Sequence, residues 1–219
     1  IDAKNIIAIA SGKGGVGKST FAVNLAVAMS QLGKKVGILD ADIYGPNQHL
    51  LFGFEDHKHE IVETPSQKLL KPLVVNNIKI ASMGPILDDD KAAIWRGPML
   101  SSALQQLIHS TDWGNLDILF VDMPPGTGDA YITISKELDI DGAVFITTKN
   151  KLSINDTAKS INTCKKLKNC CCSWGGYVWA GFGSQAFVGC RNAKANPRQP
   201  PTTNKFLVDQ GHWQHQSND

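Results

Sequence analysis

The eight residues from Gly12 to Ser19 constrain the fold of this chain more than any other stretch. They read Gly-Lys-Gly-Gly-Val-Gly-Lys-Ser, which satisfies the pattern G-x-x-x-x-G-K-[ST] for a glycine-rich loop between a strand and a helix. The apolar run in 5–11 predicts the buried strand, and a helix is expected from about Ser19 to a C-terminal cap at Gly33. Such a loop gathers backbone N–H groups around one point, which suits a polyphosphate.

Strand and helix patterns alternate along the chain after this unit. Short apolar runs predict strands at 35–40, 78–83, 116–121 and 142–148. Helical periodicity predicts helices at 98–109, 130–138 and 153–168, the last with a capping box formed by Ser153 and Asp156. The polar stretch from His49 to Lys71 is interpreted as a surface loop or insertion. The alternation favours an α/β fold, a mostly parallel, doubly wound sheet with helices on both faces.

The composition changes after Asn169. All isoleucines lie at or before Ile161, and the residues from 170 onward contain few large aliphatic side chains: Val178, Val188, Leu207 and Val208. This segment has no helical or strand period and can bury little apolar surface. We therefore expect a P-loop domain at residues 1–169 and an aberrant or poorly patterned tail at 170–219. The tail is either loop-like or disordered, or it is translated out of frame after Asn169.

Charge and cysteine content exclude several classes of protein. The 22 Lys and Arg residues nearly balance the 20 Asp and Glu residues, so the net charge of +2 indicates no nucleic-acid partner. No apolar run approaches the roughly 18 residues of a membrane-spanning helix, and the run 6–10 is too short for a signal-peptide core. The five cysteines, three of them adjacent at 170–172, do not suit a disulfide framework. We expect a soluble protein of a reducing compartment, with no membrane partner.

Each part of the glycine-rich loop has a role in binding a nucleotide. Lys18 can place its charge near the β- and γ-phosphates, and the Ser19 hydroxyl can ligate Mg²⁺. Lys13 is a second cation in the loop, which implies additional negative charge nearby or else a solvated surface lysine. The expected nucleotide-binding residues are Gly12, Lys13, Gly14, Gly15, Val16, Gly17, Lys18, Ser19 and Thr20.

Carboxylates follow two of the predicted strands. Asp40 and Asp42 stand where the strand 35–40 ends, and Asp122 ends the central strand, where α/β sheets gather their ligand groups. Asp122 suits a Mg²⁺-bound water, and the two carboxylates of Asp40 and Asp42 suit magnesium and water. Asp40 and Asp129 have the alternative role of capping a turn or helix. The stretch Pro124–Asp129 contains Gly126 and Gly128 and is expected to move when a γ-phosphate leaves.

These motifs together resemble a known family. Ser11–Thr20 is similar to the deviant Walker A motif of the MinD, ParA and nitrogenase iron protein class. Three further segments, 40–47 (Asp-Ala-Asp-Ile-Tyr-Gly-Pro-Asn), 94–99 (Ile-Trp-Arg-Gly-Pro-Met) and 121–129 (Val-Asp-Met-Pro-Pro-Gly-Thr-Gly-Asp), resemble the Mrp/ApbC type of nucleotide-binding iron–sulfur cluster carrier. The similarity runs over about residues 5–169.

The resemblance implies a slowly hydrolysing, Mg²⁺-dependent ATPase that works as a homodimer and delivers clusters to iron–sulfur apo-proteins. In such a dimer Lys13 reaches the partner's nucleotide, while Lys18 and Ser19 serve the phosphates and Mg²⁺ of their own subunit. The resemblance also gives Asp42 the task of positioning the attacking water and Asp122 that of supporting the metal. It places the protein in the bacterial cytosol or an organelle matrix.

One expected feature of the family is missing from the sequence. The family continues with a Cys-x-x-Cys whose thiolates, with those of the partner subunit, hold a [4Fe–4S] cluster, and no cysteine pair here has that spacing. No cluster ligands are therefore assigned, and the cysteines at 170–172 are interpreted as fortuitous. His57 and His59 are interpreted as parts of a solvated loop, and His212 and His215 as parts of the poorly patterned tail.

Three alternatives stay open at this point. A MinD- or ParA-like positioning switch would use the same loop but calls for an amphipathic membrane helix or a basic DNA-binding face. A small-molecule kinase or ligase would need an acceptor pocket that the sequence does not reveal. A truncated or frameshifted product without function would fail to complete its sheet after Asn169.

Overall fold

The structure is a computed structural model that describes residues 1–55, 59–63, 68–84, 97–126, 128–166, 178–182, 185–191, 206–209 and 212–215. The strands expected from the sequence are present in the first 166 residues: β2 (Ile6–Ser11), β3 (Val36–Asp40), β7 (Ile78–Ala81), β9 (Ile118–Asp122) and β10 (Gly142–Thr148). The expected helices are α1 (Lys18–Gln31), α4 (Gly97–Ser110), α5 (Asp129–Glu137) and α6 (Lys151–Lys166).

These five strands form the parallel centre of a larger sheet. Its order is β11-β12-β10-β2-β9-β3-β7-β6, with β6 (Leu73–Val75), β11 (Val178–Phe182) and β12 (Gln185–Arg191) completing it. The edge strand β6 is antiparallel to β7, and β12 is antiparallel to both β10 and β11. The prediction of an α/β fold built on a mostly parallel sheet is confirmed.

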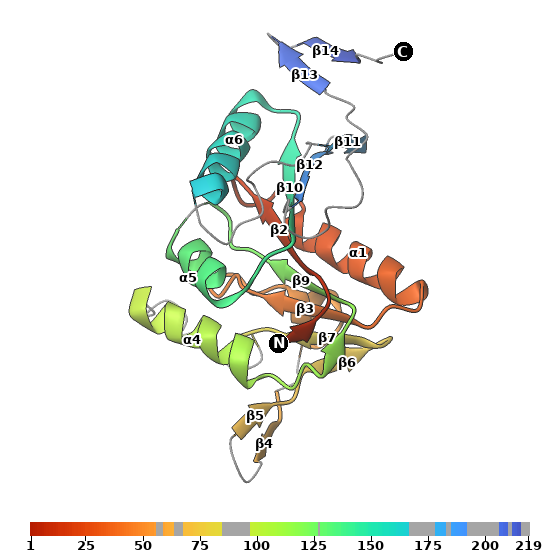
Figure 1. Cartoon of the computed structure of the whole chain (residues 1–219), viewed down its shortest axis with the longest axis vertical. Helices are drawn as coiled ribbons and strands as arrows, with labels where there is room; N and C mark the ends of the chain where they lie inside the picture. Colours follow the sequence, from red (N-terminus) through yellow and green to blue (C-terminus); the bar gives the residue numbers. More distant parts are fainter. Residues whose placement is uncertain are drawn as a thin grey trace.

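Helices cover both faces of this sheet. Figure 1 shows α1 on one side of the sheet and α4, α5 and α6 on the other. The strand residues alternate accordingly: in β2, Ile6, Ala8 and Ala10 belong to the core under α4–α6, whereas Ile9 belongs to the core under α1. Burial on both faces explains why the central strands are nearly continuous apolar runs.

The strand register brings the carboxyl ends of three strands to one edge. Asp40 of β3 pairs with Asp122 of β9, and Ile9 of β2 pairs with the same Asp122. The glycine-rich loop begins immediately after β2. The candidate site therefore lies at the carboxyl edge of the sheet, as expected for an open α/β sheet.

The stretch from His49 to Lys71 is more structured than a surface loop. It overlaps the short helix α2 (Gln48–Leu51) and contains the antiparallel pair β4 (Ile61–Glu63) and β5 (Lys68–Leu70). The side chains of Gln48 and His49 are buried. Of the two interpretations, surface loop or insertion, the surface loop is wrong for the start of this stretch, because Asp40 accepts the backbone N–H groups of Asn47 and Gln48 and holds α2 in place.

The predicted capping box of α6 is also wrong. The helix begins at Lys151, and the Asn150 side chain accepts a hydrogen bond from the backbone N–H of Leu152 at 2.8 Å. Asn150 is therefore the capping residue, and Ser153 lies inside the helix with its hydroxyl 2.9 Å from that of Thr147. The hydrogen bond to β10 replaces the one that a cap at Ser153 would have made.

The structure places strands after residue 169, where the sequence pattern predicted none. Strand β12 pairs with β10 over seven residues, and β13 (Phe206–Asp209) pairs with β14 (His212–His215). The exposed edge of β10 offers backbone N–H and C=O groups that a strand of almost any sequence can satisfy. The division into a domain at 1–169 and a tail stays a prediction.

Two smaller features complete the described chain. The short strands β1 (Asp2–Ala3) and β8 (Asn115–Leu116) pair in parallel beside the main sheet. Within the described residues, no helix combines the length and the apolar character needed to cross a membrane.

Candidate functional site

The glycine-rich loop turns directly from β2 into α1. Gly15 and Gly17 have φ of 74° and 86°, in the left-handed region that glycine adopts without strain, and Gly17 is the N-terminal cap of α1. Val16 is buried in the core under α1 and anchors the loop. The structure thus brings the nine predicted nucleotide-binding residues, 12–20, into one loop and the first turn of its helix.

Gly12 fixes the start of this loop against α6. A Cβ atom at Gly12 would lie 2.3 Å from the backbone nitrogen of Thr157 and 2.4 Å from the carbonyl carbon of Asp156. The two backbones are therefore in direct contact, and only glycine fits at this point. Gly14, by contrast, has no atom within 4 Å of such a position.

Lys18 and Asp122 form a buried ion pair at the centre of the site. The Lys18 Nζ contacts Asp122 Oδ1, and the two side chains are 7% and 1% exposed. Lys18 Nζ also lies 3.4 Å from the Ser19 Oγ. The lysine expected to meet phosphate, the serine expected to ligate Mg²⁺ and the carboxylate expected to support the metal are therefore neighbours.

Gln48 holds the other oxygen of Asp122. Its Nε2 donates to Asp122 Oδ2 at 2.6 Å and to the Ser19 backbone oxygen at 3.3 Å, and the residue is completely buried. Sequence reasoning missed Gln48, because it follows a polar stretch in which nothing local indicates burial. The nearest available signal was its position directly after the 40–47 motif.

Asp40 organises the backbone beside this pair. Its Oδ2 accepts hydrogen bonds from the backbone N–H groups of Asn47 and Gln48 and from the Ser82 hydroxyl, each at 3.0 Å. Burial, together with the charge of Asp122, raises the pKa of Asp40 to about 7. Asp40 thus holds the start of α2, although it lies seven residues before Asn47 in the sequence. This contact agrees with the alternative role of Asp40 in capping a turn or helix.

Asp42 lies at the edge of the site and is half-buried. Its Oδ1 accepts a hydrogen bond from the Gly45 backbone nitrogen at 3.3 Å. Burial raises the pKa of Asp42, and the charge of Lys18 opposes that rise. The Asp42 side chain is therefore partly accessible to solvent near Lys18. Its raised pKa means that it binds a proton more readily than an exposed aspartate does.

The segment after β9 touches the start of the loop. The Gly126 backbone nitrogen donates to the Ser11 carbonyl oxygen at 3.2 Å, and Gly126 has a φ of 86°. Thr127 and the Asp129 side chain lie outside the described residues. The expected movement of this segment stays a prediction, and so does the alternative capping role of Asp129.

Lys13 lies on the same loop as Lys18 but in a different environment. Its backbone oxygen accepts a hydrogen bond from the Ser11 hydroxyl at 2.9 Å, and its side chain is half-buried. Its predicted reach to a second subunit stays a prediction.

Two histidines flank Ser82 behind Asp40. The His59 ring contacts the Lys71 oxygen at 3.1 Å and the Ser82 oxygen at 2.9 Å, and the His49 Nδ1 lies 3.3 Å from the Ser82 Oγ. Burial lowers the pKa of both rings. The interpretation of His59 as part of a solvated loop is wrong, because contacts with the backbone oxygens of Lys71 and Ser82 hold its ring in place. His57 lies outside the described residues, as do the side chains of His212 and His215.

Side chains that could ligate a metal ion are scattered over the described residues. These residues contain no group of three or more His, Cys, Asp or Glu side chains arranged to hold a metal ion. Cys164 is 2% exposed and belongs to the core under α6, and the side chains of the other four cysteines lie outside the described part of the chain. The remaining donors are the Ser19 hydroxyl and the Asp42 and Asp122 carboxylates, and such oxygen ligands suit Mg²⁺ bound together with phosphate.

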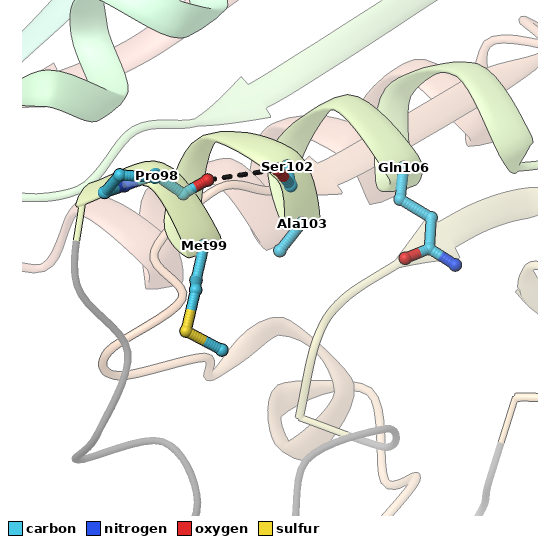
Figure 2. A pocket seen from close by; sticks show the side chains of 5 residues that line it. All are labelled: Pro98, Met99, Ser102, Ala103 and Gln106. Carbon is cyan, nitrogen blue, oxygen red and sulfur yellow. Dashed lines mark hydrogen bonds between the residues drawn. The ribbon is translucent and has the colours of Figure 1, made fainter.

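A separate groove of about 330 Å³ lies along α4. Figure 2 shows the Met99, Ala103 and Gln106 side chains on the same side of this helix, with the Ser102 hydroxyl turned back to the Pro98 oxygen at 3.1 Å. These lining residues include no ionisable side chain. The described lining of the groove therefore offers none of the acid–base chemistry found at the loop.

Comparison with known proteins identifies the family. The family model ParA, described as NUBPL iron-transfer P-loop NTPase, matches residues 2–173. The chain belongs to this family. Membership of the NUBPL iron-transfer P-loop NTPases confirms the resemblance based on the four motifs, and it supports nucleotide hydrolysis in general.

Curated relatives carry consistent names. An iron–sulfur cluster carrier protein from Synechocystis is 47% identical over 164 residues, or 75% of this chain and 46% of the relative. The iron–sulfur cluster transfer protein NUBPL from Dictyostelium discoideum is 43% identical over 165 residues, or 75% of this chain and 50% of the relative. The match thus spans about half the length of these relatives.

Solved structures agree with this NTPase fold. A nucleotide-binding protein from Archaeoglobus fulgidus in complex with ADP is 35% identical, with a TM-score of 0.64 over 77% of this chain and 64% of that one. The cell division ATPase MinD from Pyrococcus furiosus has a TM-score of 0.53 at 23% identity, covering 74% of this chain and 67% of that one. The second likeness shows the fold alone.

Proposed function

We propose that this chain is the nucleotide-dependent part of an iron–sulfur cluster carrier, binding Mg·ATP and hydrolysing it slowly as a homodimer. The observation that carries the proposal is the cluster of Lys18, Ser19 and Asp122 at the mouth of a glycine-rich loop, in a chain of the iron-transfer NTPase family. The names of the curated relatives support the same activity.

The loop would bind the triphosphate through its backbone and through Lys18. The N–H groups at the start of α1 and the helix dipole favour an anion at this end of the helix. Lys18 is held in the site by Asp122 and can exchange this carboxylate for a phosphate oxygen. Because both partners are anionic, the ammonium stays paired in either state.

Ser19, Asp122 and Asp42 would hold the magnesium that accompanies the nucleotide. Their hydroxyl and carboxylate oxygens are the ligands that this ion takes, and the buried Gln48 Oε1 is a further oxygen without a hydrogen-bond partner among the described residues. When bound, Mg²⁺ would neutralise charge that develops on the phosphates.

Asp42 would orient the attacking water. Its carboxylate is half-exposed beside the loop, and its raised pKa brings its proton affinity nearer to what a general base needs at neutral pH. The Gly45 N–H holds one of its oxygens and leaves the other for a water. Turnover is expected to be slow, since in this family the cycle controls docking and transfer.

The iron–sulfur cluster is cargo in this proposal, and iron–sulfur apo-proteins are the clients. The buried Cys164 does not fit a ligand role, and the Cys-x-x-Cys expected from the family has no counterpart in the sequence. We infer that this chain supplies the ATPase cycle and that its own cluster site is missing. We expect it to act in the bacterial cytosol or an organelle matrix.

The test compares nucleotide binding with turnover in Asp42→Asn. The variant should bind ATP with nearly unchanged affinity and hydrolyse it about 100-fold more slowly, since a positioned base contributes roughly 10²–10⁴-fold. The matched control is Asp139→Asn, at an exposed position after α5, and its turnover should equal that of the wild type. Wild-type turnover in Asp42→Asn would show that the water is positioned elsewhere.

Cargo binding needs its own measurement. After anaerobic reconstitution with iron and sulfide, this chain should retain no visible absorption from a bound cluster once desalted. A stable cluster that transfers to an apo-ferredoxin would contradict the inferred loss of the cluster site and would support cluster carriage by this chain itself.

A further inference from the structure

Among the residues that the structure describes, Gln48 is the one buried side-chain amide, and it joins the glycine-rich loop, β3 and β9. Its Nε2 donates to Asp122 Oδ2 at 2.6 Å and to the Ser19 oxygen at 3.3 Å, and its backbone N–H donates to Asp40 Oδ2 at 3.0 Å. Residue 48 thus binds two carboxylates whose strands are directly paired, Asp122 through its side chain and Asp40 through its backbone.

The two oxygens of Asp122 have different partners. Oδ1 contacts Lys18 and Oδ2 accepts from Gln48. If Lys18 turns to a nucleotide phosphate, as proposed above, Oδ1 loses its cation while Oδ2 keeps its amide donor. A carboxylate that is only 1% exposed needs such a partner to stay ionised and oriented.

The orientation of the Gln48 amide is determined by its neighbours. The nitrogen lies between two oxygen acceptors, and the flipped amide would place its oxygen against both of them. The correctly placed Oε1 is buried and has no hydrogen-bond partner among the described residues. A buried amide oxygen in this position calls for a water or a hydrated cation.

We propose that Gln48 is a positioning residue that holds the Asp122 carboxylate when Lys18 moves to phosphate, and thereby sets how tightly the site takes Mg²⁺ with the nucleotide. The proposal rests on the proposed function and extends it to a residue outside the four motifs. Gln48 acts through Asp122 and through its free Oε1, which accepts a hydrogen bond from a water of the hydrated ion.

The amide can be removed without removing the anchor of α2. Asp40 binds the backbone N–H groups of Asn47 and Gln48, which are present whatever side chain residue 48 carries. Gln48→Met replaces the amide by an apolar chain of similar length, and Gln48→Leu is a second loss of the amide with a different shape. The matched control is Gln106→Met, at an exposed glutamine on α4.

The experiment measures the affinity of a fluorescent ADP analogue while Mg²⁺ is titrated. Both Gln48 variants should bind the analogue without Mg²⁺ within about twofold of the wild type, and need about tenfold more Mg²⁺ for half of the full effect. This is the lower end of the 10–100-fold loss seen when a residue that orients a metal ligand is removed. Gln106→Met should match the wild type at every Mg²⁺ concentration.

A double-mutant cycle with Asp122→Asn separates positioning from a merely structural role. In the Asp122→Asn background, Gln48→Met should raise the Mg²⁺ requirement by clearly less than the roughly tenfold expected in the wild-type background, because the carboxylate that it positions is gone and only the contribution of Oε1 is left to lose. Additive effects, or a wild-type Mg²⁺ requirement in both Gln48 variants, would overturn the role of Gln48 while leaving the proposed function standing. If the affinity of the wild type for the nucleotide did not depend on Mg²⁺, both the role of Gln48 and the proposed function would be overturned.

Discussion

Lys18 and Asp122, 104 residues apart in the sequence, form an ion pair inside the protein with side-chain exposures of 7% and 1%. Strand β9 carries the carboxylate to the carboxyl edge of the sheet, and the first residue of α1 carries the ammonium to the same point. The lysine therefore has an anionic partner within the protein itself. A phosphate must compete with this carboxylate for the lysine.

Removing only one member of this pair should destabilise the protein without nucleotide. Lys18→Ala leaves a buried carboxylate with Gln48 as its remaining described donor, and the loss of one partner of a buried pair costs about 3–5 kcal/mol. The double variant Lys18→Ala/Asp122→Asn should recover at least about 1 kcal/mol of that loss. Urea unfolding of the wild type and these variants provides the measurement.

The exposed pair Lys159–Asp156 is the control for this cycle. Its side chains are 77% and 39% exposed, so Lys159→Ala should change the free energy of unfolding by less than about 1 kcal/mol. If Lys18→Ala also changed the free energy of unfolding by less than about 1 kcal/mol, the buried pair would contribute no more to stability than an exposed pair does.

Lys13 and Lys18 should separate nucleotide binding from dimerisation. Lys18→Ala should abolish ATP binding, whereas Lys13→Ala should leave binding by the monomer within about threefold of the wild type and remove ATP-induced dimerisation. The reason is that, among the described residues, Lys18 pairs with a carboxylate of the same subunit's site and Lys13 has no such ion pair. Equilibrium nucleotide binding and sedimentation velocity with ATP measure the two effects. Equal loss of binding in both variants would contradict the cross-subunit role of Lys13.

The sequence was sufficient to predict the strand, loop and helix around residues 6–31. Its signals are local there: an apolar run, glycines that permit positive φ, and a helical pattern that follows at once. The same holds for the five parallel strands, because burial on both faces makes each one a short apolar run. The carboxylates Asp40 and Asp122 could be placed for the same reason, since both end such runs.

Residues fixed by distant contacts could not be predicted in this way. Gln48 is buried because Asp40 holds the start of α2, and this contact depends on the register of β3 with β9. Asn150 rather than Ser153 caps α6, because the Ser153 hydroxyl is already hydrogen-bonded to the hydroxyl of Thr147 in β10. Each of these choices is decided by a partner that no local sequence pattern reveals.

The buried His49 and the half-buried His59 should make the protein less stable in mild acid. Burial lowers the pKa of His49 and His59 below the ordinary 6.5, with the charge of His59 as a further cause at His49. The unfolded chain therefore binds more protons than the folded chain as the pH falls through and below 6.5. Their contribution to stability is present above 6.5 and is lost as the pH falls through the folded pKa values.

The free energy of unfolding, measured by urea at pH 7.5, 6.5 and 5.5, tests this effect. The variant His59→Gln should lose less stability between pH 7.5 and 5.5 than the wild type, and the difference isolates the histidine because the carboxylates are common to both. His109→Gln, at an exposed position, leaves His49 and His59 in place and should retain the loss of stability on the acid side. A His59→Gln profile parallel to that of the wild type would contradict the effect of burial.

The contact between Gly12 and α6 makes a sharp steric prediction. A methyl group at Gly12 would overlap backbone atoms of Asp156 and Thr157 at 2.3–2.4 Å, and backbone cannot move aside as a flexible side chain can. Gly12→Ala should therefore lower the free energy of unfolding by about 1–3 kcal/mol or more, the usual cost of overpacking. Gly14→Ala, with no atom within 4 Å of the new methyl group, should stay within about 0.5 kcal/mol of the wild type. Both are measured by urea unfolding without nucleotide, so that effects on binding do not enter. Equal stability of the two variants would mean that the loop and α6 are not in direct contact.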